Sequence, residues 1–228
     1  MSLKFGPLKV ICFSPKSSFS CPCSINQFLM FRSIRRNHFT FPIPKQLNEV
    51  ARVPLLKQET PVKIRQLWLD QFKSRADVVV GTLAKTEFET FRANATACPM
   101  FLVPVMKEGQ ASYFNLASQF QDGKYCLLTS LDAFRSNPSS AAPMMVTTIY
   151  DELVTEKGIA LLRGDIINRL DISRQEAQTI LKFLRHVYIN KFELVKRFNH
   201  QPRSFDYDEF LSCYKTFSLD STGSSNSL

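Results

Sequence analysis

A block of alternating strand-like segments joined by tight turns lies in the middle of the chain and limits the fold more than any other feature. In the segment 111–121, apolar side chains share one face and amide side chains share the other. This period of two predicts a strand in an antiparallel sheet with one solvated side. Asp122-Gly123 follows as a tight-turn signal, so the segment 125–131 is predicted to return as the partner strand of a hairpin.

Three further segments, at 100–107, 145–150 and 159–162, have the short apolar composition of strands. Pro104 lies inside the first of them and lacks a backbone N–H, which favours an edge position or a bulge. The sequence therefore predicts about five strands that follow one another closely enough to pair as a mainly antiparallel sheet.

Helical patterns flank the strand block on both sides. Before it, helices are predicted at 60–75 and 86–94, and the apolar run 78–81 between them is interpreted as a linker. After it, a capping box at Ser173 begins a long helix with a continuous apolar stripe, and a smaller helix follows at 206–214. The predicted fold class is therefore α+β, with a mainly antiparallel sheet of about five strands flanked by N-terminal and C-terminal helices.

The distribution of charge divides the chain. It carries 29 Lys and Arg against 20 Asp and Glu, yet no acidic residue precedes Glu49 and seven basic residues do. The first 48 residues also hold seven serines, and this basic, serine-rich, acid-poor composition is typical of an organellar transit peptide. The alternative is a disordered basic tail that binds an acidic partner. We predict a transit peptide and linker at 1–48, one α+β domain at 49–217 and a disordered tail at 218–228.

The patterns that would mark an enzyme are missing from the sequence. A phosphate-binding loop would need a second glycine where Ala84 stands. Beyond the leader the cysteines are Cys98, Cys126 and Cys213, an odd and widely spaced set that predicts neither a disulfide framework nor a metal site. We predict no catalytic, cofactor-binding or metal-ligating residues. A thiol enzyme built on Cys126 stays open as an alternative, although no spacing brings His186 to it as a base.

No apolar run approaches the length of a membrane span, so no membrane insertion is expected. Basic and aromatic residues do alternate near the C-terminus, which raises the alternative of an organellar RNA-binding module. These residues are Lys191, Phe192, Lys196, Arg197, Phe198, Arg203 and Phe205. Acidic residues interrupt the stretch, which favours a solvated face of the domain, and we expect no nucleic-acid partner.

The C-terminal stretch 192–217 contains seven aromatic residues, more than a small domain readily buries. Exposed apolar side chains mark sites for protein partners. The candidates for partner binding are Phe183, Ile189, Phe205, Tyr207 and Phe210. The pattern predicts that replacing Phe205 and Phe210 with serine weakens partner binding without unfolding the domain.

Short motifs follow one another in a distinctive order between residues 60 and 214. They comprise Asn94, Cys98-Pro99, Phe101, Pro104, Glu156-Lys157-Gly158-Ile159, Leu161, Ala177-Gln178, Phe198-Asn199, Pro202 and Phe205. This order resembles the mitochondrial ATP synthase F1 complex assembly factor family, of the type that chaperones the beta subunit. The resemblance implies an α+β fold, no catalytic residues and no cofactor.

The resemblance also implies a function. A member of this family would be an ATP-independent chaperone of the mitochondrial matrix that binds the unassembled beta subunit, prevents its aggregation and hands it over to the alpha subunit. We expect such a protein to be a monomer when free. The leader does not distinguish a mitochondrion from a plastid, so the same role in a plastid stroma stays open.

Overall fold

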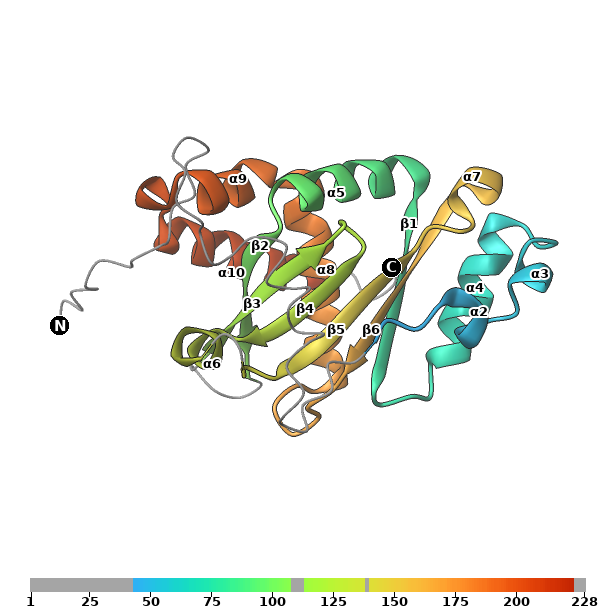
Figure 1. The fold of residues 1–228 in the computed structure, drawn as a ribbon, viewed down its shortest axis with the longest axis horizontal. Helices are drawn as coiled ribbons and strands as arrows, with labels where there is room; N and C mark the ends of the chain where they lie inside the picture. Colours follow the sequence, from blue (N-terminus) through green and yellow to red (C-terminus); the bar gives the residue numbers. More distant parts are fainter. Residues whose placement is uncertain (1–42, 108–112, 138–139, 224–228) are drawn as a thin grey trace. The chain divides into compact units, whose positions relative to one another are not determined.

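A computed structural model describes the backbone of residues 43–107, 113–137 and 140–223, and the side chains as far as residue 218 (Figure 1). The elements in chain order are α2 (Leu47–Val50), α3 (Val53–Leu56), α4 (Pro61–Phe72), β1 (Val78–Ala84), α5 (Lys85–Ala97), β2 (Met100–Met106), β3 (Tyr113–Gln121), β4 (Tyr125–Ser130), α6 (Leu131–Ser136), β5 (Pro143–Tyr150), α7 (Val154–Lys157), β6 (Ile159–Ile166), α8 (Arg174–Asn190), α9 (Phe192–His200), η1 (Pro202–Ser204) and α10 (Tyr207–Gly223).

Six strands form one sheet in the order β1-β6-β5-β4-β3-β2, and every neighbouring pair is antiparallel. The predicted α+β class, with an antiparallel sheet between N-terminal and C-terminal helices, is confirmed, with six strands rather than about five. The additional strand is β1, which begins at Val78 in the apolar run interpreted from the sequence as a linker. Its first six residues are buried on both faces of the sheet, so it lacks the alternation of apolar and polar positions that identifies a half-exposed strand.

The β3–β4 hairpin closes with the tight turn that the sequence predicts. Asp122 and Gly123 both have positive φ, 52° and 65°, and the Lys124 N–H donates to the Gln121 carbonyl at 3.1 Å. Two consecutive positive φ angles are those of the type I′ turn, whose twist matches the flanking strands. Gly123 also lies against α5, because a Cβ atom there would be 2.7 Å from the carbonyl oxygen of Arg92.

One face of the sheet packs against α5, α8, α9 and α10 and forms the larger hydrophobic core. The capping box predicted for α8 is present: Ser173 Oγ accepts from the Glu176 N–H at 3.2 Å, and Glu176 Oε2 accepts from the Ser173 N–H at 2.7 Å. Below this helix β6 carries Gly164, where a Cβ atom would collide with Met145 and lie 3.5 Å from Leu181 Cδ1. The missing side chain therefore makes room for the Met145 and Val79 side chains of the neighbouring strands, while Leu181 stays at van der Waals distance.

The helices α2, α3 and α4 pack on the other face, beside β1 and β6 (Figure 1). Trp68 of α4 donates its indole N–H to the Leu162 carbonyl at 3.1 Å and meets the Phe72 ring edge-on, with centroids 4.9 Å apart. Arg163 is buried in this layer, where it pairs with Asp165 and lies 5.1 Å from the Phe72 ring centroid. The charge is tolerated there because its guanidinium has both a carboxylate and an aromatic partner.

The edge position that Pro104 predicts for its strand is confirmed, because β2 is the last strand of the sheet. Two features block pairing along its free edge. Pro104 has no N–H to donate. In addition, Asn199 of α9 accepts from the Met100 N–H at 3.2 Å and donates to the Met100 carbonyl at 2.6 Å. The side chain thus occupies both backbone groups that another strand would use at this position.

The predicted division of the chain at residues 48 and 217 stays a prediction. Helical backbone is described on both sides of these positions, because α2 begins at Leu47 and α10 continues to Gly223. The predicted leader lies outside the described residues as far as residue 42. Among the helices that the structure describes, none has the length and apolar composition needed to cross a membrane.

Two glycines with nearly the same φ allow the packing of the β3–β4 turn to be tested. Gly123 and Gly158 have φ of 65° and 68°, but only Gly123 has atoms within 4 Å of the position that a Cβ would take. We expect Gly158→Ala to destabilise the domain by about 1–2 kcal/mol through left-handed strain alone. Gly123→Ala should cost more, because its methyl group also meets the α5 backbone. Urea unfolding followed by Trp68 fluorescence measures both, and equal losses would contradict the close packing.

Candidate protein-binding surface

The structure buries two of the five residues predicted to bind a partner. Phe183 and Phe210 have no exposed surface. The Phe183 ring centroid lies 4.8 Å from that of Tyr214, and the Phe210 centroid lies 5.5 Å from that of Phe101. Phe183, a candidate for an exposed partner contact, is buried because α10 packs against α8 and covers this side chain.

The other three candidates are half-buried and line the same core. The Phe205 ring lies 5.7 Å from Phe210, and the Tyr207 hydroxyl accepts from Asn115 Nδ2 at 2.8 Å. The structure therefore brings Phe205, Tyr207 and Phe210 together around β2, whereas Ile189 lies near the end of α8. A role for any of these residues in partner binding stays a prediction.

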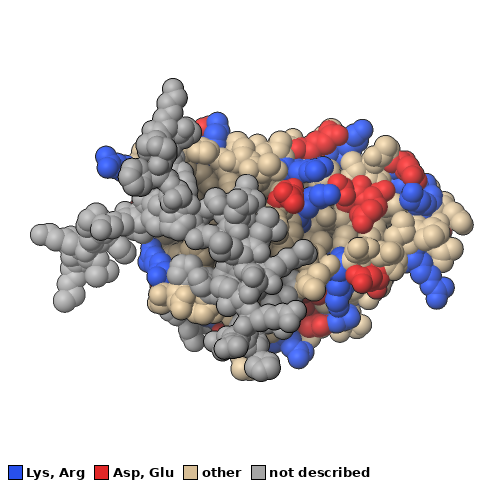
Figure 2. Space-filling view, viewed as in Figure 1, with Lys and Arg blue, Asp and Glu red and all other residues tan. Residues whose placement is uncertain are grey.

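The basic cluster that suggested RNA binding is largely neutralised by neighbouring carboxylates. Arg197 donates two hydrogen bonds of 2.8 Å to Glu209. Lys196 Nζ lies 2.5 Å from Glu193 Oε1 and 5.4 Å from the Phe192 ring centroid. Figure 2 shows the same mixture on the described part of one molecular face, where Lys and Arg side chains alternate with Asp and Glu. This arrangement does not favour the RNA-binding alternative, which needs a continuous basic groove.

The thiol that suggested an enzyme is held in its protonated form. Cys126 is fully buried, and this desolvation raises the pKa of its thiol to about 12. His186 does not act on it as a base, because its ring packs against Phe217 with centroids 5.1 Å apart. Cys126 therefore lacks both the solvent access and the thiolate form that a cysteine nucleophile requires.

A contact between a thiol and an imidazole that are 102 residues apart in sequence was not predicted. Cys98 Sγ lies 3.3 Å from His200 Nε2, and burial raises the pKa of the Cys98 thiol. Cys98 is also fully buried, and its carbonyl accepts from the Tyr188 hydroxyl at 2.9 Å. These contacts join the end of α9 and Tyr188 of α8 to the segment that leads into β2.

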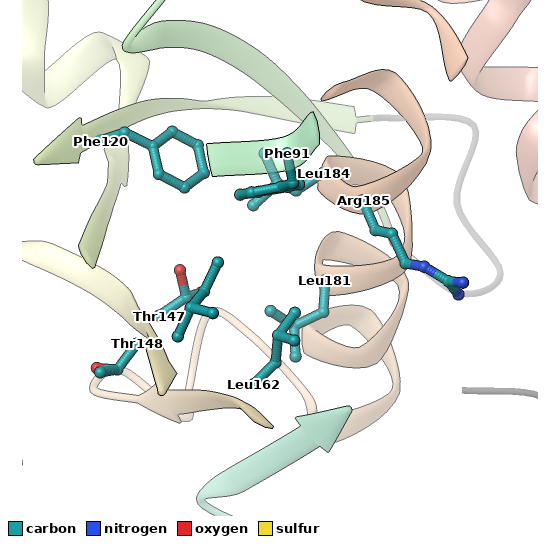
Figure 3. A pocket seen from close by; sticks show the side chains of 9 residues that line it. Phe91, Phe120, Thr147, Thr148, Leu162, Leu181, Leu184 and Arg185 are labelled. Atoms are coloured by element: carbon teal, nitrogen blue, oxygen red, sulfur yellow. The ribbon is translucent and has the colours of Figure 1, made fainter. Parts of the chain in front are cut away.

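The interior offers little room for a small molecule at the cavity beneath α8. Nine residues of the sheet, α5 and α8 line it, and Figure 3 shows that Arg185 directs its guanidinium away from this space. Its volume is about 10 Å³, close to the lower limit for a single water and far below the size of a substrate pocket. Across the described ranges, no group of three or more His, Cys, Asp or Glu could hold a metal ion.

Exposed apolar side chains gather at one end of the sheet. We name four of them the apolar rim: Met106, Tyr113, Ile167 and Leu170. Met106 and Tyr113 face each other where β2 ends and β3 begins. Ile167 and Leu170 belong to the loop after β6, a strand that stops at the same end of the sheet as β2. Lys107 connects the two parts, because its Nζ donates to the Asp171 carbonyl of that loop.

The sequence-based prediction of exposed residues does not include the apolar rim, because it rests on an excess of aromatic residues. The available signal was the segment Asn168-Arg169-Leu170-Asp171, where a leucine stands among turn-forming polar residues directly after a strand. Leucine in such a turn has no helix or strand face on which to be buried.

Comparison with known proteins yields one family and two curated relatives. Residues 32–211 match a family described as ATP11 protein. The relatives are both named ATP synthase mitochondrial F1 complex assembly factor 1; over 171 residues the Mus musculus protein is 28% identical and the Homo sapiens protein 26% identical. Each match covers 73% of this chain and 51% of the relative, so the chain spans about half the length of the curated relatives it matches.

The burial of Phe210 reverses what the sequence led us to expect of its substitution. We expect Phe210→Ala to lower the free energy of unfolding by about 3–5 kcal/mol, because it empties a fully buried aromatic site. Phe205→Ala, whose ring is half-buried, is the matched control and should cost less. Urea unfolding measured by Trp68 fluorescence gives both values, and a Phe210→Ala variant as stable as the parent would contradict the packing described here.

The protonated state of Cys126 predicts a protected thiol. At pH 8.5 iodoacetamide should modify the half-buried Cys213 in the native protein and Cys126 about a thousandfold more slowly, through unfolding. Peptide mass spectrometry would follow each cysteine separately. Because the pKa of Cys126 is raised in the folded state to about 12, stability should also fall as pH rises above about 9, where the unfolded thiol ionises. Equal labelling rates would contradict the burial.

Proposed function

The chain belongs to the ATP11 protein family, and from this we propose that it is an assembly factor for the F1 complex of the mitochondrial ATP synthase. It acts as a chaperone without ATP and without catalysis. Its partner is the unassembled beta subunit, which it protects from aggregation and transfers to the alpha subunit. It carries out this role in the mitochondrial matrix and is a monomer when free.

The family match carries the proposal, because it covers residues 32–211 and therefore nearly all of the described sheet and helices. Two relatives, each matching 73% of the chain, bear the name ATP synthase mitochondrial F1 complex assembly factor 1. No role is assigned to this chain from the half of each relative that it does not match. The proposed role is therefore assigned to the α+β domain that the chain shares with them.

The physical chemistry of subunit assembly supports a binding role of this kind. A subunit that awaits its neighbours exposes an obligate interface, which commonly exceeds about 2,000 Å² and resembles a protein core. Such a surface aggregates unless something covers it. A chaperone that binds it with modest affinity is displaced by mass action when the true neighbour arrives. Exposed apolar side chains such as those of the apolar rim suit this task, and no nucleotide is needed for it.

A light-scattering assay with isolated beta subunit tests the proposal. We expect the full chain at equimolar concentration to suppress aggregation of the beta subunit on dilution from denaturant, equally with and without ATP. Addition of folded alpha subunit should release the chaperone from the complex, as size-exclusion chromatography would show. The control is the Phe210→Ala variant, whose weakened core should reduce suppression by lowering the folded fraction. Aggregation unaffected by the full chain would refute the proposal.

A further inference from the structure

We propose that Leu170 is the anchor by which this protein engages its partner, inserting into an apolar pocket that has a carboxylate at its rim. The inference rests on the proposed function and specifies its contact surface: the pocket belongs to an unassembled ATP synthase F1 subunit, and the loop 167–172 presents the anchor to it.

The first observation is the exposure of Leu170 between buried neighbours. Its side chain is 96% exposed and that of Ile167 is 48% exposed, whereas Ile166 and Ile172, which bound the loop, are 5% and 0% exposed. Both ends of the loop are therefore seated in the core, and the leucine projects from between them. A single exposed leucine is ordinary on a protein surface, but this one shares the apolar rim with three other exposed side chains.

The second observation is that hydrogen bonds hold the loop in this shape. The Ile167 and Asn168 N–H groups both donate to the Met144 carbonyl, at 2.9 and 3.1 Å. Asn168 Oδ1 accepts from the Leu170 N–H at 3.1 Å, and the Ile172 N–H donates to the Asn168 carbonyl at 3.1 Å. The position of Leu170 is thus set before any partner arrives. A preorganised anchor loses less conformational entropy on binding than a flexible one.

The third observation is a tether from a distant strand. Lys107, which follows β2, donates to the Asp171 carbonyl and lies 3.2 Å from Glu176 Oε1 at the start of α8. The Asp171 carboxylate in turn accepts from Asn168 Nδ2. The loop is therefore fastened at its outer turn as well as at its two ends, so Leu170 would meet a partner with little rearrangement.

Charge in the loop indicates the chemistry of the pocket. The carboxylates of Asp171 and Glu176 are engaged by Asn168 and Lys107. Arg169 is exposed beside Leu170. The pKa of Asp77 is lowered by the hydrogen bonds that its carboxylate accepts from Arg75, and the charge of Arg169 helps to lower it. An apolar side chain next to an exposed cation is complementary to an apolar pocket with an acidic group at its edge. A projecting side chain also requires a concave recipient, which a subunit lacking its neighbours provides at its open interface.

The experiment compares binding of the full chain and three variants to isolated F1 beta and alpha subunits, measured separately by biolayer interferometry. Burying one leucine side chain at an interface lowers the dissociation constant by about ten- to hundredfold. We expect Leu170→Ser to weaken beta-subunit binding by at least about tenfold. Arg169→Glu should mainly slow association and reduce its dependence on salt. Val62→Ser is the matched control, because Val62 is also an aliphatic residue, is 79% exposed and lies on α4.

The outcomes separate this inference from the function on which it rests. Loss of binding in Leu170→Ser, with Val62→Ser unchanged and both variants as stable to urea as the parent, supports the anchor. Unchanged subunit binding in Leu170→Ser overturns the anchor while the chaperone function stands. The anchor is also overturned if Leu170→Ser changes only self-association, measured by sedimentation, or only binding to anionic lipid vesicles. If the parent chain binds neither subunit, the proposed function fails and the inference falls with it.

Discussion

The packing of α8 across the sheet is the interaction on which the rest of the domain depends. Leu181 of α8 packs on β6 at van der Waals distance, 3.5 Å from the position that a Cβ at Gly164 would take. Once α8 lies there, α5 joins it through the ion pair of Glu87 with Arg185, whose N···O distance is 2.6 Å, and α10 covers α8 at Phe183. The larger core is therefore built around one helix, and its contacts with α5, α9 and α10 arrange the aromatic residues of the C-terminal half.

The residues that carry the family resemblance prove to hold this arrangement together. Asn94 of α5 donates to the Tyr188 carbonyl of α8 at 2.7 Å, and Asn199 binds both backbone groups of Met100 at the sheet edge. Cys98 lies between them, with its carbonyl bonded to the Tyr188 hydroxyl. Asn94 and Asn199 thus satisfy backbone groups of α8 and β2, and the Tyr188 hydroxyl satisfies the Cys98 carbonyl. The motifs therefore identify the family through its fold, and they do not coincide with the exposed surface suited to a partner.

The apolar rim and the buried aromatic cluster are separate sets of apolar residues. The aromatic cluster of the C-terminal stretch packs mostly around Phe101 and Phe183, which leaves few aromatic rings for a partner. The apolar rim lies instead at the end of the sheet, where strands stop and loops have no layer above them. The hydrogen bonds that hold the loop of Leu170 set the position of this side chain in the free protein.

Local patterns determined the fold class, the β3–β4 hairpin, the capped α8 and the edge position of β2, because each rests on a property of adjacent residues: alternation, a turn dipeptide, a capping box or a missing N–H. They did not reveal β1, since a strand buried on both faces has no alternation to detect. The local patterns also failed to predict which large apolar side chains are exposed. Phe183 and Leu170 are both large apolar side chains, yet one is 0% and the other 96% exposed. Only the tertiary structure decided this difference, because burial depends on which element, distant in sequence, packs over each position.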